Sequence, residues 1–184
     1  MAQEIIISGF GGQGVMSMGQ LLTYAGMLEG KHVSWLPSYG PEMRGGTANC
    51  SVILADDMIG SPVVTEATAL MAMNQPSLEK FERTLISGGL LIVNSSLVNK
   101  KAIRDDIDVY YIPANEIADQ LGNIRVANMV MLGAYLEKTR GIAPDSVMES
   151  LRAVLGSSKE HLIPINRKAL EMGAGLVRPA NQPI

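Results

Sequence analysis

The sequence predicts an α/β fold, a single Rossmann-like domain in which helices cover both faces of a mostly parallel sheet. Short apolar runs alternate with amphipathic stretches along all 184 residues, a pattern typical of strands that alternate with covering helices. The apolar run 5–7 leads directly into the glycine-rich segment 8–14 (SGFGGQG) and then into an amphipathic stretch from Val15. A strand, a tight turn and a helix start therefore follow one another at the beginning of the sequence.

In the first half of the chain, the spacing of apolar residues gives the elements. Val15, Met18, Leu22 and Ala25 recur at helical spacing, and Gly30 suits the position after a helix end. A second helix begins near Asn74-Gln75-Pro76, because proline is favoured in a first turn. The expected strands are Glu4–Ser8, His32–Leu36 and Ala48–Ala55, and the expected helices are Gly14–Glu29 and Asn74–Ile86, the second of them preceded by a short apolar run over Ala67–Met73.

The second half of the chain predicts two further strands and then a run of helices. The expected strands are Leu90–Asn94 and Val109–Ile112, and the expected helices are Ala114–Leu121, Asn128–Lys138, Pro144–Leu155 and Lys159–Met172. Pro164 must lie in the first turn of the last helix or break it. We expect one domain over residues 1–177 and a C-terminal tail over 178–184.

Composition excludes several classes of function. The net charge is −3 and no basic stripe is present, so nucleic-acid binding is not expected. The first residues lack a charged leader and no apolar run approaches membrane-spanning length, which predicts a cytoplasmic protein that binds no membrane. Cys50 is the only cysteine and there are two histidines, too few for an iron–sulfur cluster or a histidine-rich metal site. Any redox metal would belong to a partner.

The glycine loop is the first candidate site. Gly9, Gly11 and Gly14 have the G-x-G-x-x-G spacing between a strand and a helix, and such a loop brings backbone N–H groups close to an anion. The carboxylate that holds a dinucleotide ribose is missing, because strand two has no acid at its end. Two interpretations stay open: a tight structural turn, or a loop that meets a phosphate, a cofactor or a partner's backbone. Gly12 belongs to the same loop, and the Gln13 amide either reaches a ligand or caps the turn.

The loop Pro37–Thr47 is the second candidate site. Arg44 suits a carboxylate or a phosphate, with Glu42 orienting it, although an internal ion pair that stiffens the loop would use the same residues. Asn128 either caps a helix or faces the same crevice. No nucleophile–base pair is present, so no catalytic residue is expected and Cys50 is interpreted as an inert thiol. The candidate residues of this loop are Tyr39, Gly40, Pro41, Glu42, Arg44, Gly45, Gly46 and Thr47.

Three segments carry a resemblance to a known family: 9–14 (GFGGQG), 37–49 (PSYGPEMRGGTAN) and 127–133 (ANMVMLG). The chain resembles the gamma subunit of 2-oxoacid:ferredoxin oxidoreductases, most closely the separate gamma chain of the 2-oxoglutarate and branched-chain types. The resemblance implies a subunit of an enzyme that oxidatively decarboxylates a 2-oxoacid, with 2-oxoglutarate the first choice, to an acyl-CoA. The electrons pass to ferredoxin.

The resemblance also implies a division of labour among subunits. Thiamine diphosphate and its magnesium ion would be held by alpha and beta chains, and the iron–sulfur clusters by other subunits such as a ferredoxin-like delta chain. The gamma chain would assist assembly and form the coenzyme A side of the site, with the glycine loop and Arg44 facing a coenzyme A phosphate or a partner's carboxylate. The alternatives are a stand-alone nucleotide-binding oxidoreductase and a ligand-free scaffold. The isolated chain, inactive by itself, would expose apolar surface and homodimerise.

Overall fold

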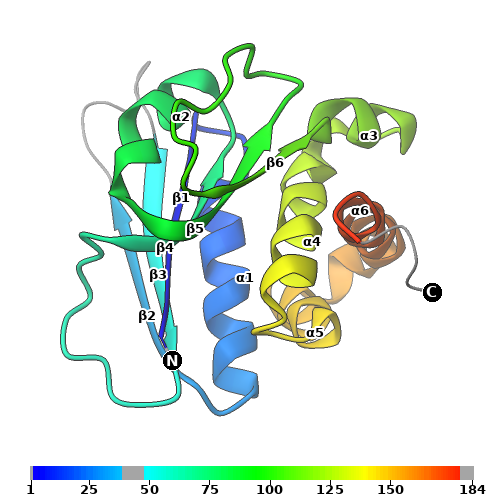
Figure 1. Cartoon of the computed structure of the whole chain (residues 1–184). Helices are drawn as coiled ribbons and strands as arrows, with labels where there is room; N and C mark the ends of the chain where they lie inside the picture. The colour runs from blue at the N-terminus through cyan, green and yellow to red at the C-terminus, as the bar shows by residue number, and fades with distance from the viewer. Residues whose placement is uncertain (1, 39–47, 179–184) are drawn as a thin grey trace.

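A computed structural model describes residues 2–38 and 48–178. Its centre is a six-stranded sheet with the order β2-β3-β1-β4-β5-β6 (Figure 1). The strands are β1 (Gln3–Gly9), β2 (His32–Ser38), β3 (Ala48–Ala55), β4 (Ala67–Ala72), β5 (Leu85–Asn94) and β6 (Asp108–Ile112). The predicted α/β class is confirmed.

The sheet is mostly parallel, as predicted, with one strand that runs against the others. β1, β4, β5 and β6 pair in parallel, whereas β3 is antiparallel to both of its neighbours, β1 and β2. The reason lies in the connection between β2 and β3. Residues 39–47 are fewer than the dozen or so that a parallel crossover needs, so β3 returns beside β2 in the opposite direction.

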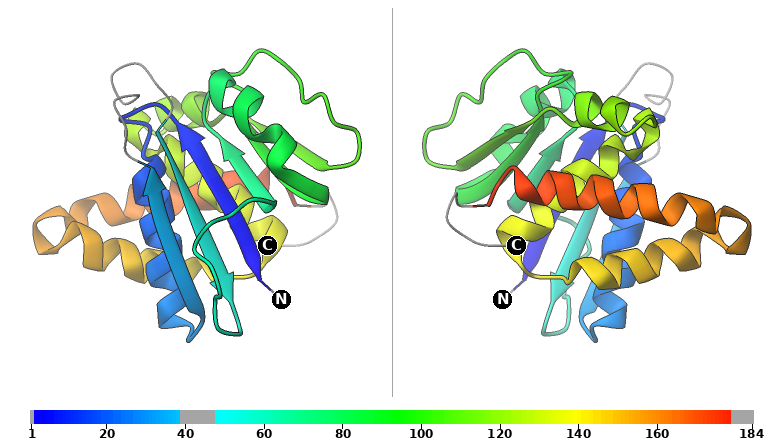
Figure 2. Two further views of the ribbon diagram at one scale, coloured as in Figure 1. Left: turned by 90° about the vertical axis from the view of Figure 1, so that its left-hand side faces the viewer. Right: turned by 90° about the vertical axis from the view of Figure 1, so that its right-hand side faces the viewer.

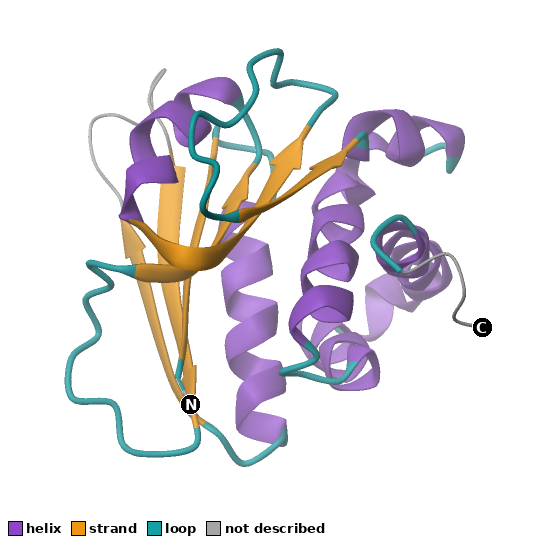
Figure 3. Cartoon of the chain, in the orientation of Figure 1, coloured by secondary structure: helices purple, strands orange, loops and turns teal. Residues whose placement is uncertain are grey.

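Helices cover both faces of the sheet, but unequally. Figure 3 shows most of them on one side, where α1 and α4 lie against the strands and α5 and α6 form an outer layer. On the opposite face α2 packs beside the sheet (Figure 2). The helices are α1 (Val15–Leu28), α2 (Gln75–Phe81), α3 (Ala114–Gln120), α4 (Ala127–Thr139), α5 (Pro144–Leu155) and α6 (Ile163–Gly175).

Two expected helices differ from the structure. The second helix ends early: α2 stops at Phe81, a short 3₁₀ turn spans Glu82–Thr84, and β5 already begins at Leu85. Gly88, which has a positive φ of 73°, and Gly89 lie inside β5, so the glycine pair is part of a strand where it was expected to end a helix. The last helix is likewise split into a 3₁₀ segment, Ser157–Leu162, and α6, with Pro164 in the first turn of α6.

Alternation along the strands divides the core in two. Ile5 and Ile7 face α1 and α4 and belong to the larger apolar cluster, whereas Ile6 points the other way into a smaller cluster beneath α2. Met18 and Met71 are fully buried in the larger cluster. These methionines therefore act as ordinary core residues.

Small residues set the contact between α4 and α6. A Cβ atom built on Gly133 would lie 2.7 Å from the carbonyl carbon of Leu170, and one built on Gly173 would lie 2.7 Å from that of Val130. The two helices therefore touch backbone to backbone. No helix in residues 2–38 or 48–178 is both long and apolar enough to cross a membrane.

A buried carboxylate holds the segment between β5 and β6. Glu82 is 3% exposed, and its Oε1 accepts hydrogen bonds from the backbone N–H groups of Ile103 (2.6 Å) and Arg104 (2.9 Å). At the other end of the chain, Arg178 forms an ion pair with Glu137 (3.0 Å). Residues 179–184 of the predicted tail lie outside the described residues.

Candidate functional site

The glycine loop lies at the carboxyl end of β1 and leads into α1. Gly12 and Gly14 have φ values of 90° and 78°, a backbone region that glycine enters without steric cost. Gly14 is the N-cap residue of α1 and, having no side chain, supplies no side-chain cap. Within residues 2–38 and 48–178, nothing lies within 4 Å of a Cβ built on Gly11 or Gly12. The described residues therefore leave the loop uncovered at these two glycines, beside the positive end of a helix dipole.

Gln13 turns back into the loop. Its Oε1 accepts a hydrogen bond from the backbone N–H of Phe10 (2.6 Å), while its own backbone N–H donates to the Phe10 carbonyl oxygen (3.2 Å). Its Nε2 donates to the carbonyl oxygen of Met73 (3.5 Å). Of the two roles predicted for this amide, the structure supports the cap of the turn.

Asn128 comes from a distant part of the chain and meets the glycine loop. A Cβ built on Gly14 would lie 2.5 Å from its Nδ2, and the residue is only 8% exposed. Asn128 is the second residue of α4, whose N-cap is Val126, so the prediction of an N-cap role is wrong. Its Oδ1 accepts only from the adjacent Met129 N–H (2.9 Å) among the bonds of the described residues. An amide donor thus stands beside the start of α1.

The ends of the second candidate loop reach the same edge of the sheet. Ala48 is paired with Gly9, and Ser38 with Asn49. Ala48 therefore lies beside the end of β1, and Ser38 lies one strand further out, on β2. The predicted site residues within it (Tyr39, Gly40, Pro41, Glu42, Arg44, Gly45, Gly46 and Thr47) lie outside the described residues.

Sequence reasoning missed a set of amides that join the ends of neighbouring strands. Asn74 Nδ2 donates to Gln13 Oε1 (3.3 Å), and Asn94 Nδ2 donates both to the Met73 carbonyl (3.3 Å) and to Asn115 Oδ1 (2.8 Å). Asn94 is fully buried, and its Oδ1 has no hydrogen-bond partner among the described residues. The signal was present in the sequence, because Asn74 and Asn94 each come directly after a run of apolar residues.

Cys50 lies away from this edge, in the core between β3 and α1. Burial raises the pKa of its thiol to about 12. The thiol is therefore protonated and unreactive at neutral pH, as predicted. Within residues 2–38 and 48–178, no three His, Cys, Asp or Glu residues are grouped so that they could hold a metal ion.

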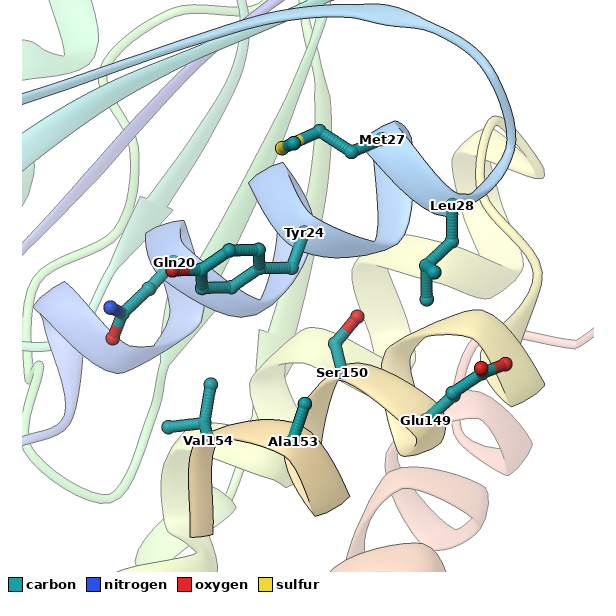
Figure 4. A pocket seen from close by; sticks show the side chains of 8 residues that line it. All are labelled: Gln20, Tyr24, Met27, Leu28, Glu149, Ser150, Ala153 and Val154. Carbon is teal, nitrogen blue, oxygen red and sulfur yellow. The ribbon is translucent and has the colours of Figure 1, made fainter. Parts of the chain in front are cut away.

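A second concave surface lies between α1 and α5 (Figure 4). It has a volume of about 620 Å³ and consists mainly of apolar side chains, of which Met27 (56%) and Leu28 (53%) are well exposed. Its lining residues are Gln20, Tyr24, Met27, Leu28, Glu149, Ser150, Ala153 and Val154. Few polar groups converge here, so the groove suits contact with apolar surface better than chemistry.

Comparison with known families decides the relationship. The profile of the family described as pyruvate ferredoxin/flavodoxin oxidoreductase matches residues 4–176. The chain belongs to this family. The resemblance seen in the sequence is thereby confirmed, and the three segments that carried it all fall within the matched range.

Pyruvate ferredoxin/flavodoxin oxidoreductase relatives differ in how much of their length this chain covers. Ketoisovalerate oxidoreductase subunit VorA of Methanothermobacter marburgensis is 40% identical over 176 residues, which are 95% of this chain and 36% of VorA. The chain thus spans about a third of the VorA relatives it matches. 2-Oxoglutarate synthase subunit KorC of the same organism is 36% identical over 159 residues, which are 83% of this chain and 86% of KorC.

Solved structures of the family have the same fold. A keto/oxoacid ferredoxin oxidoreductase gamma subunit from Geobacter sulfurreducens gives a TM-score of 0.81 at 30% identity, and the match covers 95% of this chain and 98% of that one. A 2-oxoglutarate:ferredoxin oxidoreductase from Magnetococcus marinus, solved with 2-oxoglutarate, coenzyme A and succinyl-CoA bound, gives 0.86 at 23% identity. It covers 96% of this chain and 31% of the other, and it supports the fold alone.

Proposed function

We propose that this chain is the gamma subunit of a multi-subunit 2-oxoacid:ferredoxin oxidoreductase. The proposal rests on how much of each chain the matches cover. The family match runs over 4–176, and KorC and the Geobacter gamma subunit are covered over 86% and 98% of their own lengths. Both relatives are therefore separate chains of similar size. In VorA the matching region is 36% of the chain, so the same domain also occurs within a longer polypeptide.

The reaction of the whole enzyme would be oxidative decarboxylation of a 2-oxoacid to an acyl-CoA, with reduction of ferredoxin. The KorC relatives favour 2-oxoglutarate as the substrate, because they match over most of their length. The higher identity of VorA, 40%, favours a branched-chain 2-oxoacid as the second candidate. We infer a cytoplasmic enzyme, since coenzyme A and ferredoxin are cytoplasmic reactants.

We assign the cofactors to other subunits. Thiamine diphosphate with its magnesium ion would be held by alpha and beta chains, and the iron–sulfur clusters by partners that include a ferredoxin-like delta chain. The residues of this chain do not fit a cluster: Cys50 is its only thiol and is fully buried, whereas a cluster needs about four thiolates. The isolated chain would then be inactive.

The part that this chain plays at the site is binding. The start of α1, the open backbone at Gly11 and Gly12 and the Asn128 amide would together face a phosphate of coenzyme A, because unpaired N–H groups and a helix dipole favour an anion. Gly14 allows the backbone to turn there, and Gly9 leaves room for the Gln13 side chain beside it. Arg44 would add a positive charge from the second loop, or would bind a partner's carboxylate.

The first test is a pull-down of the tagged chain from its native cell under anaerobic conditions. The eluate is assayed for coenzyme A-dependent reduction of viologen with 2-oxoglutarate, pyruvate and 3-methyl-2-oxobutanoate. Activity with one acid, together with larger subunits, supports the proposal and gives the substrate. A chain that elutes alone and inactive but binds NADH contradicts it and favours a stand-alone oxidoreductase.

The second test separates coenzyme A binding from scaffolding. In the assembled enzyme, Arg44→Ala and Asn128→Ala are expected to raise the KM for coenzyme A several-fold while the KM for the 2-oxoacid stays constant. A variant enzyme with an unchanged KM for coenzyme A but impaired assembly would favour a ligand-free scaffold.

The groove between α1 and α5 supports one more proposal, that the chain homodimerises when it is produced without partners. Light scattering after size-exclusion chromatography would report a dimer. Tyr24→Glu, which places a charge in the groove, should shift the chain to a monomer; a monomeric parent chain would refute the proposal.

A further inference from the structure

We propose that Asn74 is a positioning residue that holds the glycine loop through Gln13 and so keeps the start of α1 free for an anionic ligand. This inference rests on the proposed function of that site. Asn74 is not a residue of the glycine loop; it lies two residues after the end of β4 and is the N-cap of α2. The residue is only 2% exposed.

Asn74 uses the two ends of its amide for different elements. Its Oδ1 accepts a hydrogen bond from the Ser77 N–H (3.0 Å) and thereby caps α2. Its Nδ2 donates to Gln13 Oε1 (3.3 Å), the same oxygen that accepts from the Phe10 N–H. The cap requires only an acceptor, whereas the link to Gln13 requires a donor. A carboxylate or a hydroxyl could therefore replace the amide as the cap of α2, but neither provides a donor to Gln13 in the same geometry.

The link matters because of where Gln13 stands. It directly precedes Gly14, the N-cap of α1, and a glutamine at this position has the length to fold forward onto the first N–H groups of the helix. In the structure its amide is turned away, toward Phe10, Met73 and Asn74, and the N-cap residue of α1, Gly14, has no side chain with which to cap the helix. Three hydrogen bonds thus hold the Gln13 amide away from the backbone N–H groups at the start of α1. Loss of the Asn74 donor should release Gln13 to compete with a ligand.

Two substitutions separate the roles. Asn74→Asp and Asn74→Ser both keep an acceptor for the α2 cap, and both remove the donor to Gln13. Because aspartate adds a charge and serine does not, an effect shared by the two reflects the lost donor. Asn166→Ser is the matched control: Asn166 of α6 also donates a hydrogen bond from its side-chain amide, in its case to the carbonyl oxygen of Leu162 at the start of the same helix (2.8 Å).

Two readouts are expected to change. In the full-length chain, hydrogen exchange at the Phe10 and Gln13 amides should accelerate about 3- to 10-fold in both Asn74 variants, the range that follows from one lost neutral hydrogen bond. In the assembled enzyme, the KM for coenzyme A should rise by about the same factor with kcat unchanged. Exchange within α2 should stay at the parent level, and Asn166→Ser should alter neither readout.

The outcomes distinguish this inference from the proposed function. Faster exchange in the loop with an unchanged KM for coenzyme A would confirm the positioning role and refute coenzyme A binding at this edge. Exchange that stays at the parent rate in the loop would overturn the positioning role whatever the enzyme assay shows. Faster exchange throughout α2 would also overturn it, because Asn74 would then act only through its cap.

Discussion

One added methyl group at Gly133 should separate two helices of this protein. The contact leaves no room for it, because a Cβ on Gly133 would lie 2.7 Å from the carbonyl carbon and 2.9 Å from the Cα of Leu170. These are backbone atoms, and real Cβ atoms are essentially never closer than 3.0 Å to a neighbour. Relief requires α6 to move outward by roughly 1 Å, since a packed interior cannot absorb the overlap locally.

The cost of Gly133→Ala is the difference between two opposing terms. Overpacking of a tight interface costs about 1–3 kcal/mol, and alanine recovers about 1 kcal/mol through its higher helix propensity. The free energy of unfolding should therefore fall by up to about 2 kcal/mol, equivalent to a decrease in Tm of up to about 8 °C. Gly173→Ala acts at the same crossing, so the double variant should cost less than the sum of the single changes.

Urea unfolding followed by circular dichroism measures this effect, with Gly175→Ala as the control. Gly175 also lies in α6, but nothing stands within 4 Å of its Cβ position. Its substitution should leave stability unchanged or raise it slightly. The reasoning about backbone contact would be refuted if Gly133→Ala were as stable as Gly175→Ala.

Three further predictions follow from other contacts. Gly14→Ala should destabilise the chain more than Gly30→Ala. Both residues have positive φ (78° and 74°), but only a Cβ on Gly14 would clash with Asn128. Thermal unfolding should show that adding Asn128→Ala to Gly14→Ala removes most of the difference. Glu82→Ala should leave two backbone N–H groups without their acceptor, at roughly 1–3 kcal/mol each, and should expose the 95–107 segment to proteolysis, whereas Glu82→Gln retains an acceptor and should not. For the Cys50 thiol, the pKa is about 12 in the fold against an ordinary 9.0, so its stabilising effect is complete below pH 9 and is lost as the pH rises toward 12, by about 1.4 kcal/mol per unit. Urea unfolding at pH 8 and pH 10.5 should show a smaller decline for Cys50→Ala than for the parent chain, and equal declines would contradict the prediction.

The sequence was sufficient where local signals and burial agree. The bounds of β3 (Ala48–Ala55) and α5 (Pro144–Leu155) match the expected ranges. In β3 alternate positions face the core, and in α5 a proline begins the helix. It failed at β5, where Gly88-Gly89 was taken as a helix end. Pairing of Leu85 with Ala67 extends the strand through both glycines, and a long-range pairing leaves no local trace.

The candidate site shows the same division. The G-x-G-x-x-G spacing predicted the strand, the turn and the helix start at the glycine loop, because glycine chemistry and local order suffice for that. The approach of Asn128 to Gly14 and the link from Asn74 to Gln13 join residues far apart in the chain. They depend on how α4 and α2 pack on the sheet. Sequence alone therefore predicted the backbone of the glycine loop but not the side chains that surround and hold it.

The amide side chains that hold the glycine loop do not titrate near neutral pH. Gln13, Asn74, Asn94 and Asn115 are amides, and the Ser8 hydroxyl donates to that of Ser77 (2.9 Å) beneath them. None of these groups gains or loses a proton between about pH 4 and pH 10. The loop should consequently keep the same conformation across that pH range, whereas a loop held by a histidine or a carboxylate would change when that group is protonated. A phosphate monoester, by contrast, changes charge near pH 6. If such a group binds to the loop, the pH dependence of its affinity would therefore come from the ligand and not from the loop.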